Sequence, residues 1–323
     1  MAATLPLATE VDQKDIDEAR AFNAQLEALI ASVPSVHTVP AEVTRKTRRA
    51  GTGIFPAPVF LESSTDLEVP GRSGPIKVRV IRPDRQATGI YLHVHGGGWT
   101  LGGHDMQDVL LKQLANETGL VAASVNYRLA PENPYPAGPD DCEDAILHLL
   151  ERGPDLLGAP AWFAIGGESA GAHLSVVTLL RLRDRHAIRN RIAAANLVFG
   201  AYDLNGTPSQ ILWGDRNLVL SQPIIKWFVG NFLPSSSFEQ RRDPDISPIY
   251  AKLDDMPMAL FSVGTMDCLI DDSLFMAERW RLAGNFADVV IFPEAVHGFT
   301  AYPIGVARKA NAKQFDFLRS AQS

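Results

Sequence analysis

A serine flanked by glycines is the most informative chemical feature of the sequence. The segment GESAG at 167–171 directly follows the apolar stretch 162–166, and a helical pattern begins at residue 170. A serine at such a strand–turn–helix junction lies on a very tight turn, so only small residues fit two positions away on either side. The following helix points its first N–H groups toward the serine oxygen. The pattern predicts that Ser169 is a nucleophile.

A run of glycines provides a second element of the same chemistry. The segment HGGGW at 95–99 comes at the end of an apolar strand pattern, and no Gly-Lys-Ser/Thr follows it as in a phosphate-binding loop. Acyl transfer needs N–H donors where negative charge develops on the carbonyl oxygen. We expect the backbone N–H groups of Gly97, Gly98 and Ala170 to form this oxyanion hole.

A serine hydroxyl also needs a base, and the base needs an orienting acid. Among eight histidines, His297 lies in a loop after a strand pattern, at the edge of the sheet where catalytic groups collect. His173 falls in the helix after Ser169, where packing is the expected role. His95 is expected to order the glycine loop, and its pairing with His93 lacks the third ligand of a metal site.

The acid is expected between the serine and the histidine in the chain. Asp267 follows the apolar segment 258–263, whereas Asp271 and Asp272 lie where a helix begins and are expected to cap it. The predicted catalytic set, in chain order, is Ser169, Asp267 and His297.

The elements that must position these residues alternate along the chain. Segment 76–81 has the period-two pattern of a half-exposed antiparallel strand. More continuously apolar strands are predicted at 89–95, 120–126, 162–166, 196–200, 258–263 and 288–292. Helical patterns lie near 106–118, 140–151, 170–183, 272–283 and 306–320. Apolar strands alternating with helices predict an α/β fold with a mostly parallel central sheet and helices on both faces.

Two regions depart from this alternation and are predicted to form a helical cap. An amphipathic helix over 12–33 is followed by an arginine-rich stretch, 34–58, expected to be a mobile connector or a flap over a pocket. The predicted division has an N-terminal cap region at 1–60, core at 61–202, an aromatic-rich cap insertion at 203–249 and core again at 250–323.

Composition excludes several other classes. The net charge of −7 argues against a nucleic-acid partner, and two cysteines are too few for a disulfide framework or a four-thiolate zinc site. The sequence starts with no secretory pattern and contains no apolar run long enough for a membrane span. These features predict a soluble, cytoplasmic protein, and the predicted chemistry of Ser169, Asp267 and His297 needs no metal or organic cofactor.

Together these motifs resemble the hormone-sensitive-lipase-like branch of the α/β hydrolases, in particular its bacterial esterases. The resemblance runs from about residue 75 to the C-terminus and includes VNYRLAPE at 125–132 and His297-Gly-Phe. The order serine, aspartate, histidine is also the α/β-hydrolase order. Glu168 stands where the family more often has Asp or Thr, and Cys268 stands where Pro is common.

The resemblance implies hydrolysis of carboxylic esters, and the acidic chain without a large apolar lid favours short- to medium-chain acyl esters. An amidase or N-formyl hydrolase with the same triad is the nearer alternative. A non-catalytic ligand receptor on this scaffold is more distant, because His297 is intact. The expected partner is a small-molecule ester, and a homodimer through the edge strand or last helix stays an alternative to a monomer.

Overall fold

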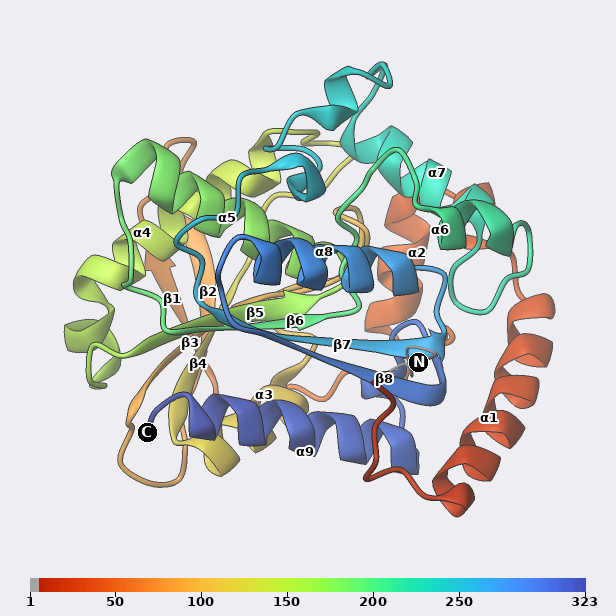
Figure 1. The fold of residues 1–323 in the computed structure, drawn as a ribbon, viewed down its shortest axis with the longest axis horizontal. Coiled ribbons are helices and arrows are strands. Elements are labelled where there is room, and N and C mark those ends of the chain that lie inside the picture. Colours follow the sequence, from red (N-terminus) through yellow and green to blue (C-terminus); the bar gives the residue numbers. More distant parts are fainter. Residues whose placement is uncertain (1–5) are drawn as a thin grey trace.

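A single eight-stranded sheet runs through the molecule in the computed structural model, which describes residues 6–323 (Figure 1). The strand order is β1-β2-β4-β3-β5-β6-β7-β8, in which β1–β2 and β2–β4 pair antiparallel and all other pairs are parallel. The strands are β1 Thr65–Val69, β2 Ile76–Ile81, β3 Gly89–Val94, β4 Leu120–Val125, β5 Phe163–Glu168, β6 Ala194–Val198, β7 Met258–Met266 and β8 Ala287–Val296. The predicted α/β fold with a mostly parallel sheet is confirmed.

Helices cover both faces of this sheet. In Figure 1, α4, α5 and α8 lie on one face, and α3 and α9 lie together on the other. The helices are α1 Gln13–Ala31, α2 Ala41–Arg49, α3 Asp108–Thr118, α4 Ala137–Leu157, α5 Ala170–His186, α6 Pro208–Trp213, α7 Gln222–Phe232, α8 Ile270–Leu282 and α9 Gly305–Ser320. Strands β3 and β4 are buried along their whole length, which explains their continuous apolar character.

Three strands run further than their apolar patterns predict. Strand β5 ends at Glu168, β7 at Met266 and β8 at Val296, so the residues that follow them directly are Ser169, Asp267 and His297. In β8 the pattern stops early because Pro293 and Glu294 interrupt the apolar run. All three strands are parallel, and their carboxyl ends therefore bring these residues to one edge of the sheet.

The expectation of a mobile connector over 34–58 is wrong. This stretch contains a short 3₁₀ helix, Val36–Thr38, and the nine-residue helix α2. In helix α2 the only apolar residues are Ala41 and Val43, so its composition resembles that of a solvated loop. Its stability comes from long-range contacts instead, because Arg45 and Arg49 reach carbonyl and carboxylate oxygens on the core.

The segment 203–249 carries α6 and α7 and lies against the N-terminal region. Arg216 in this segment pairs with Glu27 on α1 at 2.9 Å, and α7 packs on the 3₁₀ helix Val36–Thr38.

Strand β8 forms the edge of the sheet opposite β1, and there Leu7 forms a parallel bridge with Ile291. The chain's own N-terminal segment thus pairs with part of the exposed edge of β8.

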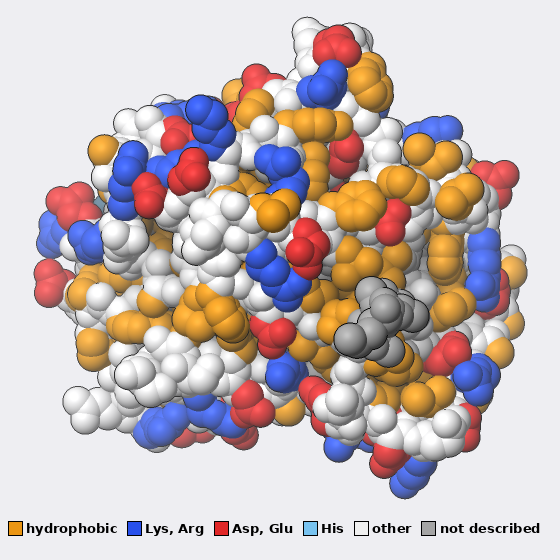
Figure 2. All heavy atoms as spheres, in the orientation of Figure 1, with side chains coloured by type: hydrophobic (Ala, Val, Ile, Leu, Met, Phe, Trp, Pro, Cys, Tyr) orange, Lys and Arg blue, Asp and Glu red, His pale blue; other side chains and the backbone are white. Residues whose placement is uncertain are grey.

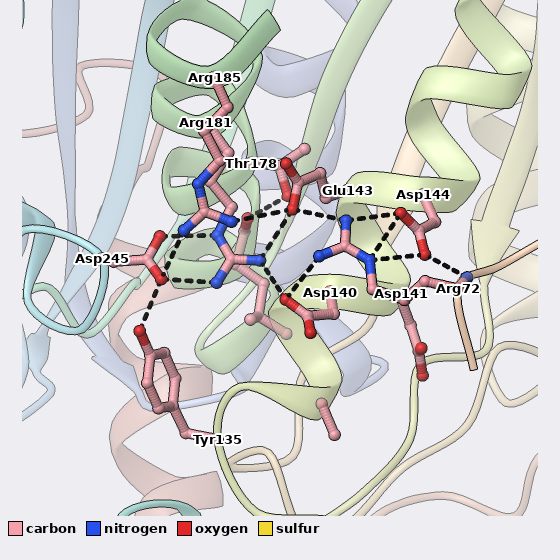
Figure 3. Close-up of polar contacts among 12 residues, drawn as sticks. Arg72, Tyr135, Asp140, Asp141, Glu143, Asp144, Thr178, Arg181, Arg185 and Asp245 are labelled. Carbon is pink, nitrogen blue, oxygen red and sulfur yellow. Dashed lines mark hydrogen bonds and ion pairs between the residues drawn. The ribbon is translucent and has the colours of Figure 1, made fainter.

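An ionic network ties α4 and α5 to the end of the segment 203–249 (Figure 3). Arg181 of α5, only 2% exposed, pairs with Asp140 at 2.8 Å, Glu143 at 3.1 Å and Asp245 at 2.5 Å. Tyr135 donates to the same Asp245 at 2.7 Å. One buried guanidinium therefore joins α4 and α5 to the segment before β7, and Tyr135 adds a link from the loop before α4.

The molecular surface mixes both signs of charge with scattered apolar side chains. In Figure 2 apolar side chains gather over α6 and α7, where Ile211 and Leu212 are among the exposed large residues. Within residues 6–323, every helix is too short or too polar to cross a membrane.

Candidate active site

The structure brings the three residues of the predicted catalytic set into one hydrogen-bonded line. Ser169 Oγ lies 2.9 Å from His297 Nε2, and His297 Nδ1 lies 2.8 Å from Asp267 Oδ2. Asp267 is 1% exposed and His297 is 6% exposed. An imidazole held by a buried carboxylate on one nitrogen can accept the serine proton on the other.

Ser169 occupies a strained turn, as the glycine spacing predicts. Its backbone has φ 56° and ψ −119°, and its N–H donates to Val198 O at 2.9 Å. A Cβ on Gly167 or Gly171 would overlap the carbonyl oxygen of Val94, so the strand beside the turn leaves no room for a side chain there. Such strained positions persist where the surroundings hold them, and they are common at active sites.

Asp271 and Asp272 do not cap α8, contrary to expectation. The helix begins at Ile270, which places both aspartates inside its first turn. Asp271 accepts from Ser209 N at 2.7 Å, and the fully buried Asp272 accepts from Tyr202 N at 2.7 Å. Burial raises the pKa of Asp272 to about 6. Both carboxylates therefore fasten the segment after β6 to α8 and leave His297 to Asp267.

The glycine loop has backbone conformations that favour glycine. Gly97 and Gly98 have φ of 119° and 58°, values that glycine adopts without strain. Among residues 6–323, none accepts a hydrogen bond from the amide N–H of Gly97, Gly98 or Ala170. A Cβ on Gly98 would overlap the ring of Phe228. Three unpaired donors are thus available beside the loop.

His95 holds this loop through its ring, in agreement with the sequence-based expectation. Its Nδ1 lies 2.9 Å from Gly96 O, and its ring stacks on Tyr127 at 4.3 Å. Tyr127 in turn donates to the carbonyl of His95 at 2.9 Å. His93 turns to other partners, Ser124 at 2.8 Å and the carboxylate of Glu168.

Glu168, the unusual residue before the nucleophile, forms a polar cluster behind it. Its Oε2 lies 3.2 Å from His93 Nε2 and accepts from Gln107 Nε2 at 3.1 Å. Burial would raise the pKa of the Glu168 carboxyl, but the charge and hydrogen bond of His93 and the hydrogen bond of Gln107 outweigh it. The pKa therefore lies below its ordinary value. Glu168 is held as a carboxylate and has defined partners.

His173 has a polar role that the sequence analysis missed. The indole Nε1 of Trp99 donates to His173 Nδ1 at 3.1 Å, and His173 Nε2 lies 2.8 Å from Ile246 O. Because Nδ1 accepts, the proton is on Nε2 and the ring is neutral. Burial lowers its pKa to about 4. A histidine four residues after the nucleophile, one helical turn on, is the only sequence signal for this position.

Aromatic side chains from several elements lie next to the site. Phe199, after β6, contacts the ring of His297 edge-on at 4.8 Å. Phe228 of α7 lies against Gly98, and Phe55 from the N-terminal region lies against Gly298, next to His297. The N-terminal region and the segment 203–249 therefore each contribute a ring to the surroundings of the site.

Fold and site together define an α/β hydrolase, and a family model of the alpha/beta hydrolase fold matches residues 91–301. Carboxylic ester hydrolase LipN of Mycobacterium tuberculosis is 34% identical over 262 residues, which cover 79% of this chain and 69% of LipN. Carboxylesterase NlhH of the same species is 30% identical, covering 73% of this chain and 75% of NlhH. The hyperthermophilic esterase of the archaeon Pyrobaculum calidifontis superposes with a TM-score of 0.84 at 27% identity, covering 98% and 99% of the two chains.

The chain belongs to the α/β-hydrolase family, as an enzyme of its hormone-sensitive-lipase-like esterase branch. This agrees with the sequence-based resemblance. The family match begins at residue 91, so the first 60 residues, which carry Phe55 and Arg45, lie outside it.

Proposed function

We propose that this enzyme hydrolyses carboxylic esters through an acyl-enzyme on Ser169. The observation that supports it best is the continuous hydrogen-bonded line from Ser169 Oγ through His297 to the buried Asp267. The named relatives, which are carboxylic ester hydrolases, are consistent with this reaction.

The proposed reaction proceeds in two halves. Ser169 Oγ attacks the ester carbonyl carbon while His297 Nε2 takes the hydroxyl proton, and Asp267 stabilises the resulting imidazolium. The N–H groups of Gly97, Gly98 and Ala170 bind the oxyanion. As the C–O bond breaks, His297 returns the proton to the leaving alkoxide. Water then attacks the acyl-enzyme, with His297 as base, and releases the carboxylic acid and Ser169.

We propose further that the described part of the N-terminal region, within residues 6–60, and residues 203–249 form a cap over this site and restrict it to short- and medium-chain acyl groups. The Arg216–Glu27 ion pair joins the two segments, and Phe55 and Phe228 bring a ring from each toward the loops of the site. Aromatic walls of this kind bind an apolar acyl chain but limit its length.

The reaction is tested by release of p-nitrophenol from acetate, butyrate, octanoate and palmitate esters by the wild type and Ser169→Ala. We expect turnover to be strongest on the shorter esters and to fall by about 10⁴-fold or more in the variant. A folded wild type that is inert on every ester would reject the reaction. Turnover of palmitate above that of butyrate would reject the size limit alone.

The same panel should include p-nitroacetanilide and p-nitrobutyranilide, since an amidase would use the same triad. The anilides keep the acyl group and change only the leaving atom from oxygen to nitrogen. We expect kcat/KM to be higher on the ester of each pair. A higher value on the anilide would make the protein an amidase.

A further inference from the structure

Arg45, on helix α2 of the N-terminal region, hydrogen-bonds to the loop that carries two of the expected oxyanion donors, Gly97 and Gly98. Its Nε donates to Thr100 O at 2.8 Å, and its Nη2 donates to Ala130 O at 2.6 Å. The guanidinium also forms a fork with Glu132, at 2.9 Å and 2.8 Å. All three of its nitrogens therefore have partners on the core.

The loop that Arg45 contacts is held in a tight conformation. Trp99, the residue after Gly98, has a φ of 57°, a costly value for a bulky side chain. The amides of Thr100 and Leu101 both donate to Gly97 O, at 3.1 Å and 2.8 Å. Ala130 N donates to Trp99 O at 2.9 Å, which joins this loop to the segment that precedes α4.

Arg45 adds a second connection between the glycine loop and the segment before α4. The two carbonyls that it binds, on Thr100 and Ala130, belong to the two segments that the Ala130–Trp99 bond joins. Its ion pair with Glu132, whose side chain is 53% exposed, contributes little by itself. The contacts that matter are the two carbonyl bonds, which require the planar fork of arginine and which a lysine cannot reproduce.

We propose that Arg45 is a positioning residue for the oxyanion hole. By tying Thr100 O to Ala130 O, it holds the peptide planes of Gly97 and Gly98 in the orientation that binds the oxyanion. The geometry of the hole then depends on one side chain of α2, a helix outside the family match. This inference rests on the proposed function, since it requires ester cleavage at Ser169.

The test compares Arg45→Gln with Arg49→Gln on p-nitrophenyl butyrate. Arg49 lies one turn further along the same helix and pairs with Asp105 at 3.0 Å, so its variant also removes one charge and one contact between α2 and the core. We expect Arg45→Gln to lower kcat about 10- to 100-fold with KM within about twofold, because a misplaced donor affects the transition state more than substrate binding. Arg45→Lys should lose nearly as much kcat, because lysine keeps the charge but cannot make both carbonyl bonds, and Arg49→Gln should stay near wild type.

Hydrogen exchange provides a readout that does not depend on activity. The amides of Thr100 and Leu101 should exchange faster in Arg45→Gln than in the wild type and in Arg49→Gln. If Arg45→Gln matches Arg49→Gln in kcat, or if its exchange is unchanged, the positioning role is rejected. An inert wild type would reject the proposed function, whereas an active wild type with an unaffected Arg45→Gln would reject the role of Arg45 alone.

Discussion

Three aspartates lie within six residues of one another after β7, and the partners of their carboxylates distinguish them. Asp267 accepts from Leu269 N at 2.9 Å and contacts His297, while Asp271 and Asp272 bind groups of the segment after β6. Only Asp267 can orient the base in the proposed reaction.

Asp267→Asn should therefore lower kcat by about 10⁴-fold, because an amide can hold the imidazole in the wrong tautomer and cannot stabilise its charge. Asp271→Asn removes the same charge four residues away and should retain activity within a few fold. Steady-state hydrolysis of p-nitrophenyl butyrate by both variants measures the difference. Equal losses in the two variants would remove Asp267 from the proposed mechanism.

A catalytic effect of substituting Gly98 can be distinguished from the backbone strain that alanine causes at any glycine with a positive φ. Gly98→Ala adds a Cβ at a φ of 58° and against Phe228, whereas Gly158→Ala adds one at a φ of 64° with nothing within 4 Å. Both variants should lose about 1 kcal/mol of unfolding free energy from the backbone conformation. Gly98→Ala alone should also lose about 10²-fold or more in kcat, because the oxyanion donors shift.

Urea unfolding and steady-state kinetics measure the two effects separately. Wild-type kcat in Gly98→Ala would contradict the assignment of Gly98 to the oxyanion hole. Reduced kcat in Gly158→Ala would mean that strain anywhere in the fold disturbs the site.

At the scale of elements, a buried ionic network holds α4 and α5 together. Arg181 connects α5 to α4 through Asp140 and Glu143, and to the segment that precedes β7 through Asp245 (Figure 3). Arg185, one turn later on α5, pairs with two of the same carboxylates, those of Glu143 and Asp245, but its side chain is 44% exposed.

Arg181→Gln should lower the free energy of unfolding by about 3–5 kcal/mol, because it removes the buried countercharge of three carboxylates and leaves them to the more exposed Arg72 and Arg185. Arg185→Gln should cost less than about 1 kcal/mol, as expected for a solvated ion pair. Urea denaturation at pH 7.5 gives both values. Similar losses in the two variants would show that burial does not distinguish the two arginines.

At the scale of the whole molecule, buried histidines make stability depend on pH. His173 has a pKa of about 4 when folded, against an ordinary value of 6.5. Between these values the unfolded chain binds a proton that the folded chain does not, so stability is highest above pH 6.5 and falls as the pH drops toward 4. Asp245 and Arg181 are the charged groups that also influence this ring.

His173→Gln should remove about 2–3 kcal/mol of the stability loss between pH 7.5 and pH 4.5, because glutamine does not titrate. Unfolding free energies from urea denaturation at the two pH values measure this loss. His148→Gln is the control, since that histidine is partly exposed on α4. An unchanged pH dependence in His173→Gln would assign the loss to other groups.

The sequence by itself determined the α/β fold and which residues lie near the carboxyl ends of its strands. Ser169, Asp267 and His297 could be proposed from the sequence because each lies shortly after an apolar strand pattern, and strands and tight turns leave local patterns of apolar and small residues. The same local patterns located HGGGW at 95–99.

Tertiary structure decided what these residues touch. Arg45 contacts residues 55 and 85 positions away, His173 binds a carbonyl 73 positions away, and Asp272 binds an amide 70 positions away. Such contacts leave no periodic signal, because the chain segments meet only after the sheet and its helices have packed. The sequence therefore predicted a connector where α2 docks on the oxyanion loop, and helix caps where carboxylates bind a distant segment.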